Sequence, residues 1–348
     1  MSVSQKEKLF FTEHFSLMLK AEIPLAEVLE ILRDEVKSGV FKKTLSDVIK
    51  RVLEGESLNK GLEKHPKIFD NFFRSVVKIG EESGTLQENL RYLSDSLRSE
   101  YALRRKIIGA LIYPALIMIF ALFVVVLITV FILPKLLRLF QSLEIQLPLA
   151  TRILLGSGSF LQKYWLFILG GVFLCLLIFK ILQRIQGVRF YFHKSILFLP
   201  LFGSIEKNRN LARFSRNFYT LYKSGIPLLE ALDICVESTS NEVFKRDIAS
   251  ARAGVEGGER ISTGLKRASK NFPLVFSQMI LVGEKTGTLE ESMLYLAEFY
   301  EAEVDSVLKN LSGILEPILL ILVGFFIVFV ALSIIVPIYQ FTTNLRIG

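Results

Sequence analysis

The sequence contains few of the side chains that carry catalysis or bind metals. Its 348 residues include only two cysteines, Cys175 and Cys235, and three histidines that stand apart from one another. Two widely separated cysteines provide neither a disulfide framework nor a zinc site, and we expect both to pack as apolar residues. No His-x-x-x-His, Cys-x-x-Cys or Gly-x-Ser-x-Gly pattern occurs. The sequence therefore predicts no cofactor, no metal and no catalytic residue.

A concentrated basic surface is also missing, although the net charge is +8. Residues 1–106 carry 19 basic and 17 acidic side chains, and residues 184–310 carry 17 and 15. Binding to nucleic acid needs a clustered basic stripe that neutralises phosphates. We therefore expect no nucleic-acid partner.

Apolar residues are abundant instead, at 51% of the chain. They concentrate in three stretches at 107–133, 165–179 and 314–339, and the only acid among them is Glu316. A hydrocarbon core of about 30 Å needs roughly 20 helical residues, so the first and third stretches are long enough to span a bilayer. Aromatic and basic neighbours extend the second to 164–183. The alternative is three helices buried in a protein core.

The orientation follows from the positions of lysine and arginine. Basic residues crowd the entry to the first span and the exit of the second, whereas the loop at 134–163 holds only four across thirty residues. By the positive-inside rule the N-terminus and residues 184–310 face the cytoplasm. The loop at 134–163 and the tail at 341–348 then face outward.

One unit is written twice in the chain. Residues 11–134 align with 214–337 without a gap, and 36 of the 124 pairs are identical. Apolar residues recur at three and four positions within each copy, which predicts about six helices per copy. The predicted fold is all-α: an integral membrane protein with two homologous cytoplasmic helical bundles and three transmembrane helices. The predicted segments are a first bundle at 1–106, spans at 107–133, 164–183 and 311–340, an outer loop at 134–163, a second bundle at 184–310 and an outer tail at 341–348.

The most similar stretches of the two copies are GEESGTLQENL at 80–90 and GEKTGTLEESM at 283–293. Each contains the Thr-x-x-Glu spacing of a capping box and two glycines that allow left-handed backbone where one helix ends and another begins. We interpret both as helix corners, and as possible partner contacts. The corner residues are Gly80, Glu81, Gly84, Thr85 and Glu88 in the first copy and Gly283, Glu284, Gly287, Thr288 and Glu291 in the second.

A nucleotide-binding loop is the other interpretation of the second corner. Such a loop needs a lysine directly after its last glycine and a strand before it. Here Glu284 separates Gly283 from Lys285, and the first copy has Glu82 in place of the lysine. Carboxylates at these positions would repel phosphate, so the sequence argues against an ATPase site.

Glu316 is the only acid in any predicted span and precedes Pro317, and Tyr113 and Pro114 occupy the matched positions in the first copy. A carboxylate within the membrane tends to contact protein or to carry function. Contact with another helix or a partner, and extension to the lipid headgroups, both remain open for Glu316. The two prolines predict kinks near the cytoplasmic face.

Taken together, these features resemble the type II secretion F-type inner-membrane proteins, which include the platform proteins of type IV pilus and competence machines. The resemblance rests on the duplication, the three spans, the paired corners, Leu147 and Pro148 with Thr151 in the outer loop, and the segment from Pro200 to Gly203. It implies a non-enzymatic platform in the bacterial cytoplasmic membrane that forms homo-oligomers. It further implies three kinds of protein partner: a separate cytoplasmic secretion or pilus ATPase, pilins or pseudopilins, and other inner-membrane assembly proteins.

Two rival functions stay open on the residues alone. Internal repeats are common in transporters and channels, although no polar side chains mark a site at the centre of these spans. A membrane-anchored signalling scaffold differs from the platform only in its partner.

Overall fold

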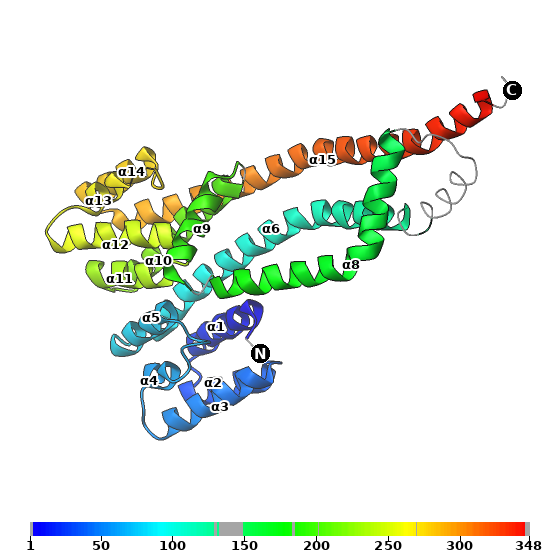
Figure 1. Cartoon of the computed structure of the whole chain (residues 1–348). Helices are drawn as coiled ribbons and strands as arrows, with labels where there is room; N and C mark the ends of the chain where they lie inside the picture. The colour runs from blue at the N-terminus through cyan, green and yellow to red at the C-terminus, as the bar shows by residue number, and fades with distance from the viewer. Residues whose placement is uncertain are drawn as a thin grey trace. The chain divides into compact units, whose positions relative to one another are not determined.

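Helices form the regular structure of the chain. The computed structural model describes residues 3–128, 131, 149–182, 185–200, 202–268 and 270–344, and no strand occurs among them (Figure 1). The predicted all-α class is confirmed over these residues. Two compact units are present, one made of Met1–Lys106 with Phe190–Val307 and the other of Ile107–Arg189 with Leu308–Gly348.

The first unit holds the bundle part of both repeats, and six helices begin in each repeat. The first repeat comprises α1 (Gln5–Lys20), α2 (Leu25–Glu35), α3 (Gly39–Leu53), α4 (Leu58–Glu63), α5 (Asn71–Glu82) and α6 (Leu86–Leu127). The second repeat follows α9 (Gln186–Phe198) and comprises α10 (Phe202–Lys223), α11 (Leu228–Ser238), α12 (Glu242–Glu256), α13 (Ile261–Arg267), α14 (Leu274–Thr286) and α15 (Leu289–Asn344).

Side-chain caps begin several of these helices. Ser4, Ser38, Ser57 and Asp70 each accept a hydrogen bond from a backbone N–H in the first turn of the helix that follows. Asn241 does the same at the start of α12. Most of the helices in the bundles have 6 to 16 residues, a length at which isolated helices are marginal in water. Burial of their apolar faces therefore supplies most of their stability.

A repeated set of phenylalanines forms the centre of each bundle. Phe11, Phe15, Phe41, Phe69 and Phe73 are at most 1% exposed, and the residues 203 positions later are phenylalanines that are at most 3% exposed. Within each set, neighbouring ring centres lie about 5–6 Å apart in tilted or edge-on arrangements, a geometry that aromatic pairs favour. The shared aromatic core explains why the same six-helix pattern forms twice.

The first repeat packs against the second through α5, which contacts α10 and α11 (Figure 1). The polar and aromatic contacts are Asn71 Nδ2 to Glu237 Oε2 (2.5 Å), Arg213 Nη2 to Glu100 Oε1 (3.6 Å) and Lys223 Nζ to the ring centre of Tyr92 (5.5 Å). Asn71 on α5 and Tyr92 and Glu100 on α6 thus all contact the second repeat.

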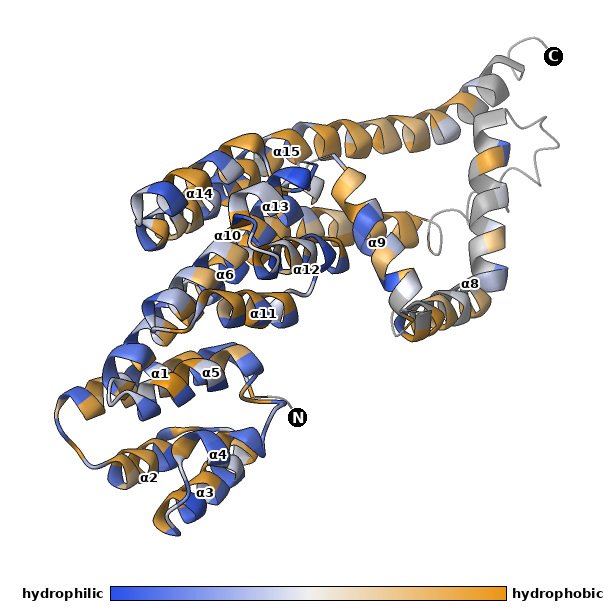
Figure 2. Ribbon diagram, turned by 90° about the vertical axis from the view of Figure 1, so that its left-hand side faces the viewer, coloured by the Kyte–Doolittle hydropathy of each residue, from blue (hydrophilic) through white to orange (hydrophobic). Residues whose placement is uncertain are grey.

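The longest helices lead from the corners into the apolar stretches. Among the described residues, two helices are long and apolar enough to cross a membrane, Leu86–Leu127 and Leu289–Ser333. The hydrophobic run of α15 is orange in Figure 2. Helix α8 (Leu149–Leu182) contains residues 164–182 of the second predicted span and also the end of the predicted outer loop, and residue 183 lies outside the described residues. The rest of that loop, at 134–148, and the end of the predicted tail, at 345–348, lie outside the described residues.

Candidate functional site

The two corners have the same backbone geometry. Helix α5 ends at Glu82 and α6 begins at Leu86, and Gly84 between them has a φ of 72°. At the second corner, Gly287 between α14 and α15 has a φ of 75°. A side chain disfavours this left-handed conformation, so glycine suits both positions. The chain therefore turns in the same way at the start of both long helices.

The other two corner glycines serve a different purpose from the one expected. Gly80 and Gly283 lie inside α5 and α14, and neither has a positive φ. A Cβ at Gly80 would lie 2.9 Å from Leu86 Cα, and one at Gly283 would lie 2.6 Å from Ser292 Oγ. The two helices at each corner approach too closely for any side chain at these positions. Close helix packing, rather than left-handed backbone, requires these glycines.

The corner glutamates cap a distant helix in both repeats. The carboxylate of Glu81 accepts hydrogen bonds from the backbone N–H groups of Leu58 (2.6 Å) and Asn59 (3.0 Å), which begin α4. The carboxylate of Glu284 accepts from the N–H groups of Ile261 (2.6 Å) and Ser262 (3.3 Å) at the start of α13, and from the Ser262 hydroxyl. The first N–H groups of a helix have no intrahelical partner, and a carboxylate also interacts favourably with the helix dipole there. Each corner is thereby fastened to a short helix about 20 residues earlier.

The remaining corner residues lie at the surface. Thr85 Oγ1 is 2.6 Å from Ser83 Oγ, and Thr288 Oγ1 is 2.7 Å from Thr286 Oγ1. Glu88 is exposed in the first turn of α6, and Glu291 occupies the same place in α15. Acidic residues in a first turn complement the helix dipole. Glu88 and Glu291 are therefore accessible to a partner, whereas Glu81 and Glu284 are partly buried.

The predicted intramembrane residues of the two repeats meet in the second unit. Tyr113 Oη donates a hydrogen bond to Glu316 Oε1 at 3.5 Å. These two residues occupy the same position in the two repeats, 203 residues apart. Pro114 and Pro317 are the next residues, and both α6 and α15 continue through them as helix. A helix-to-helix contact therefore exists for Glu316.

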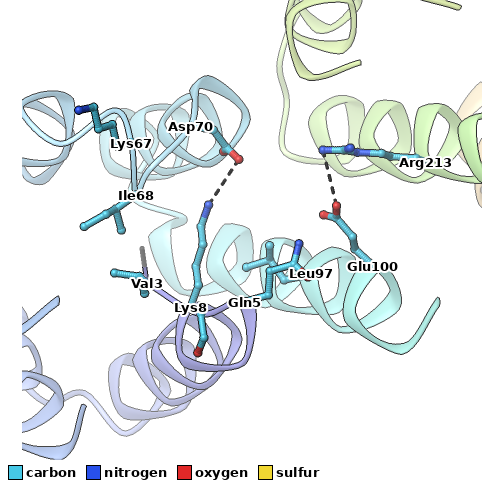
Figure 3. A pocket seen from close by; sticks show the side chains of 10 residues that line it. Val3, Gln5, Lys8, Lys67, Ile68, Asp70, Leu97, Glu100 and Arg213 are labelled. Atoms are coloured by element: carbon cyan, nitrogen blue, oxygen red, sulfur yellow. Dashed lines mark hydrogen bonds and ion pairs between the residues drawn. The ribbon is translucent and has the colours of Figure 1, made fainter. Parts of the chain in front are cut away.

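A polar cavity in the first unit is lined by nine residues of the first bundle and by Arg213 of α10, and Figure 3 displays its side chains. Its volume is about 210 Å³. Two ion pairs cross it, Lys8 with Asp70 at 3.5 Å and Arg213 with Glu100 at 3.6 Å. Three basic and two acidic residues line it in total. Because its walls come from four separate stretches of the chain, at 3–8, 67–70, 97–100 and 213, no local pattern in the sequence marks it.

Hydrogen bonds and burial shift the pKa values of several groups in the bundles. His65 Nε2 lies 2.9 Å from Asp47 Oδ2, and this bond, together with Arg51, lowers the pKa of Asp47. Burial raises the pKa of the Cys235 thiol and that of Asp247, so a thiolate nucleophile is disfavoured at Cys235. Within the described ranges, no group of three or more His, Cys, Asp or Glu side chains is placed to hold a metal ion.

Comparison with protein families gives a match on each repeat. The sequence model of the family described as "Type II secretion system (T2SS), protein F" matches residues 11–134 and again residues 214–337. These are the same two segments that align with each other inside the chain.

Similar proteins cover nearly the whole chain. The type IV pilus assembly protein PilC of Pseudomonas aeruginosa is 30% identical over 331 residues, which are 95% of this chain and 88% of the relative. PilC of Myxococcus xanthus is also 30% identical, over 92% of this chain and 77% of its own length. A type II secretion system protein F of Aeromonas hydrophila is 29% identical, over 97% and 87% respectively.

Proposed function

The chain belongs to the type II secretion system protein F family, and we propose from this that it is an inner-membrane platform protein of a type IV pilus or type II secretion machine. The observation that carries the proposal is the double match of the family to the two repeats. Relatives named for both machines are similar over most of the chain. The proposal therefore includes both machines.

The proposed arrangement in the membrane has three spans, at 107–133, 164–183 and 311–340. Both bundles, at 1–106 and 184–310, lie in the cytoplasm, and the loop at 134–163 and the tail at 341–348 face outward. The length and apolar composition of α6 and α15 support two of these spans. The distribution of lysine and arginine supports the orientation.

The proposed activity is mechanical, and the chain has no catalysis of its own. A separate cytoplasmic ATPase contacts the bundles, and their movement reaches pilins or pseudopilins in the membrane. The continuity of α6 and α15 from the corners into the apolar stretches supports this path, because a helix transmits rotation and tilt along its axis. The caps at Glu81 and Glu284 help to hold each bundle rigid against its long helix.

Two surfaces are the proposed partner contacts. At the corners, the exposed carboxylates of Glu88 and Glu291 face the ATPase or another assembly protein. Within the membrane, Glu316 and Tyr113 hold α6 and α15 together and set the position of the surface that a pilin transmembrane segment meets. Transporters and signalling scaffolds remain rivals, but neither explains the family match as directly.

Genetic complementation tests this function. Cells of the source bacterium that lack the gene are expected to lose surface filaments or secreted substrate and to regain them with the wild-type chain. Glu316→Gln and Tyr113→Phe are expected to reduce assembly, while Lys180→Gln in the second span serves as a matched membrane control. Unchanged assembly with both variants would remove the proposed role of this pair.

Biochemical assays separate the platform from its rivals. Purified chain in lipid vesicles is expected to leave ATP intact and to carry no solute, and to bind the machine's ATPase when that protein is added. Cysteines placed at Lys43 or Ser250 are expected to react only with thiol reagents that reach the cytoplasm. Labelling of either position from outside, or ATP hydrolysis by the chain alone, contradicts the proposal.

A further inference from the structure

One face of the second repeat exposes a group of large apolar side chains. Leu274, Val275 and Val282 on α14 are 57%, 65% and 52% exposed, and Tyr295 and Phe299 at the start of α15 are 54% and 41% exposed. The spacings of seven and four residues place the α14 group and the α15 pair each on one side of its helix. Clustered exposed apolar side chains are typical of interaction surfaces.

The matched face of the first repeat is covered by the second repeat. Tyr92, Ser96 and Glu100 follow one another at intervals of four on α6, and the outer two contact Lys223 and Arg213 of α10. Ser96, between them, is only 5% exposed, whereas Phe299 at the same position of the second repeat is 41% exposed.

Helix α5 repeats this contrast. Phe72 is 6% exposed, whereas Val275 at the matched position is 65% exposed, and the neighbouring Asn71 bonds to Glu237 of α11. We call the face of α5 and α6 in the first repeat, and the matched face of α14 and α15 in the second, the donor face.

The surface that receives the donor face also occurs twice, and we call it the acceptor face. In the second repeat it lies on α10 and α11, and in the first repeat the matched surface lies on α1 and α2. Lys20 and Asp34 occupy the positions of Lys223 and Glu237 and keep their charges, and both are exposed. Leu17 is 56% exposed there. Within each chain, the donor face of the first repeat is covered by the acceptor face of the second repeat. The acceptor face of the first repeat and the donor face of the second repeat are both open.

We propose that the open donor face of one copy docks on the open acceptor face of a second copy, as the two repeats dock within one chain. This inference rests on the homo-oligomer named in the proposed function and assigns its surface. The open donor face is more apolar than the covered one, since Leu274 replaces Asn71 and Phe299 replaces Ser96. Lys20 of the second copy would lie over Tyr295, as Lys223 lies over Tyr92.

The proposed contact is head-to-tail, because different faces of the two copies meet. Such contacts generate rings when the rotation closes. In both repeats, the helix that carries the donor face continues into an apolar stretch suited to a membrane. Copies that dock on one another as the two repeats of one chain do would therefore all send their apolar helices into the bilayer from the same side.

Cross-linking of the full chain in membranes tests this pairing. Two differently tagged copies are co-expressed in a background with Cys175→Ala and Cys235→Ala, one with Leu274→Cys and the other with Asp34→Cys. A short thiol cross-linker is expected to join the two copies. Replacing Asp34→Cys by Ser250→Cys, which is exposed on α12 and belongs to neither face, is expected to give no joined product.

A second pair and an internal control strengthen the test. Tyr295→Cys with Lys20→Cys in separate copies is expected to cross-link as well. Asn71→Cys with Glu237→Cys in one copy is expected to cross-link within the chain, since these side chains touch there. This control confirms that the reagent spans the contact.

Charge substitutions on the donor face test its importance. Val275→Glu with Phe299→Glu is expected to reduce cross-linking of Tyr295→Cys to Lys20→Cys at least tenfold, which corresponds to about 1.4 kcal/mol of association free energy. Leu53→Glu, at an apolar position that is 65% exposed on α3, is expected to have no effect, and thermal unfolding checks that all variants fold.

The possible failures are distinguishable. Oligomers detected on native gels without cross-links at either matched pair would overturn the proposed surface and leave the oligomer in place. A strictly monomeric chain in membranes would overturn both the surface and the homo-oligomer. Neither result bears on complementation of filament assembly, which tests the platform function separately.

Discussion

Replacing Glu284 by glutamine should loosen α13 and the corner that it supports. Its carboxylate accepts hydrogen bonds from the N–H groups of Ile261 and Ser262 and from the Ser262 hydroxyl. Arg260, at the N-cap of α13, provides no side-chain hydrogen bond of its own. Glutamine removes the charge and turns one acceptor into a donor that faces other donors. Most of the capping of α13 is therefore lost.

The expected cost follows from the contacts. A hydrogen bond to a charged group contributes about 1.5–3 kcal/mol, and the loss of a helix cap costs about 0.5–2 kcal/mol. Since Glu284 is only partly buried, we expect about 2 kcal/mol for Glu284→Gln. Glu81→Gln should cost less, about 1 kcal/mol, because α4 keeps the side-chain cap of Ser57 and Glu81 bonds to two donors rather than three.

Hydrogen exchange on the full chain in detergent measures this difference. The peptide that contains Ile261 and Ser262 should exchange roughly 30-fold faster in Glu284→Gln, since 1.4 kcal/mol corresponds to a factor of ten. The peptide that contains Leu58 and Asn59 should exchange about fivefold faster in Glu81→Gln. The control is Glu82→Gln, because Glu82 is the exposed neighbour of Glu81.

Two results would refute this reasoning. Equal protection of α13 in wild type and Glu284→Gln would mean that the carboxylate does not stabilise the helix. Loss of ATPase binding in both variants with unchanged hydrogen exchange would mean that the glutamates act as a partner contact instead.

Three further predictions concern backbone strain, helix packing and charge. Glu22 has a φ of 61° where the second copy has Gly225, so Glu22→Gly should raise the free energy of unfolding by about 0.5–1 kcal/mol in thermal melts, and Gly225→Ala should lower it. Gly283→Ala should destabilise the chain by about 1–3 kcal/mol through overpacking, while Gly39→Ala, which has open space around it, should not. The bond to His65 and the charge of Arg51 lower the pKa of Asp47 in the folded state, so this carboxylate stabilises the fold above its unfolded pKa of about 4, and that stabilisation is lost as the pH falls through the folded pKa. The melting temperatures of Asp47→Asn and wild type should therefore differ at pH 7 and converge once the pH lies below the folded pKa.

The outline of the molecule could be predicted from the sequence because its signals are linear. A fixed offset of 203 residues exposes the repeat, apolar runs mark the long membrane helices, and the period of the apolar residues identifies helices rather than strands. The left-handed positions at Gly84 and Gly287 also follow from local chain chemistry.

The role of individual corner residues could not be predicted, because it depends on partners elsewhere in the chain. Glu81 and Glu284 cap helices that begin 23 residues earlier, and no local pattern points to that distance. Gly80 and Gly283 look like helix ends in the sequence but lie where two helices nearly touch. The capping-box spacing predicts that the hydroxyls of Thr85 and Thr288 accept from a first-turn N–H. The structure instead pairs them with the hydroxyls of Ser83 and Thr286, which the spacing does not specify.

The sequence by itself determined that this protein is a duplicated helical module joined to apolar membrane helices, because composition, period and repeat are properties of the linear chain. Only the tertiary structure decided which face of each module is covered. The two copies carry matched surfaces, yet α5 buries its face against α10 and α11 while α14 leaves the same face open. The physical reason is that burial depends on which surfaces meet in space, and a chain with two copies has one copy of each face left without a neighbour.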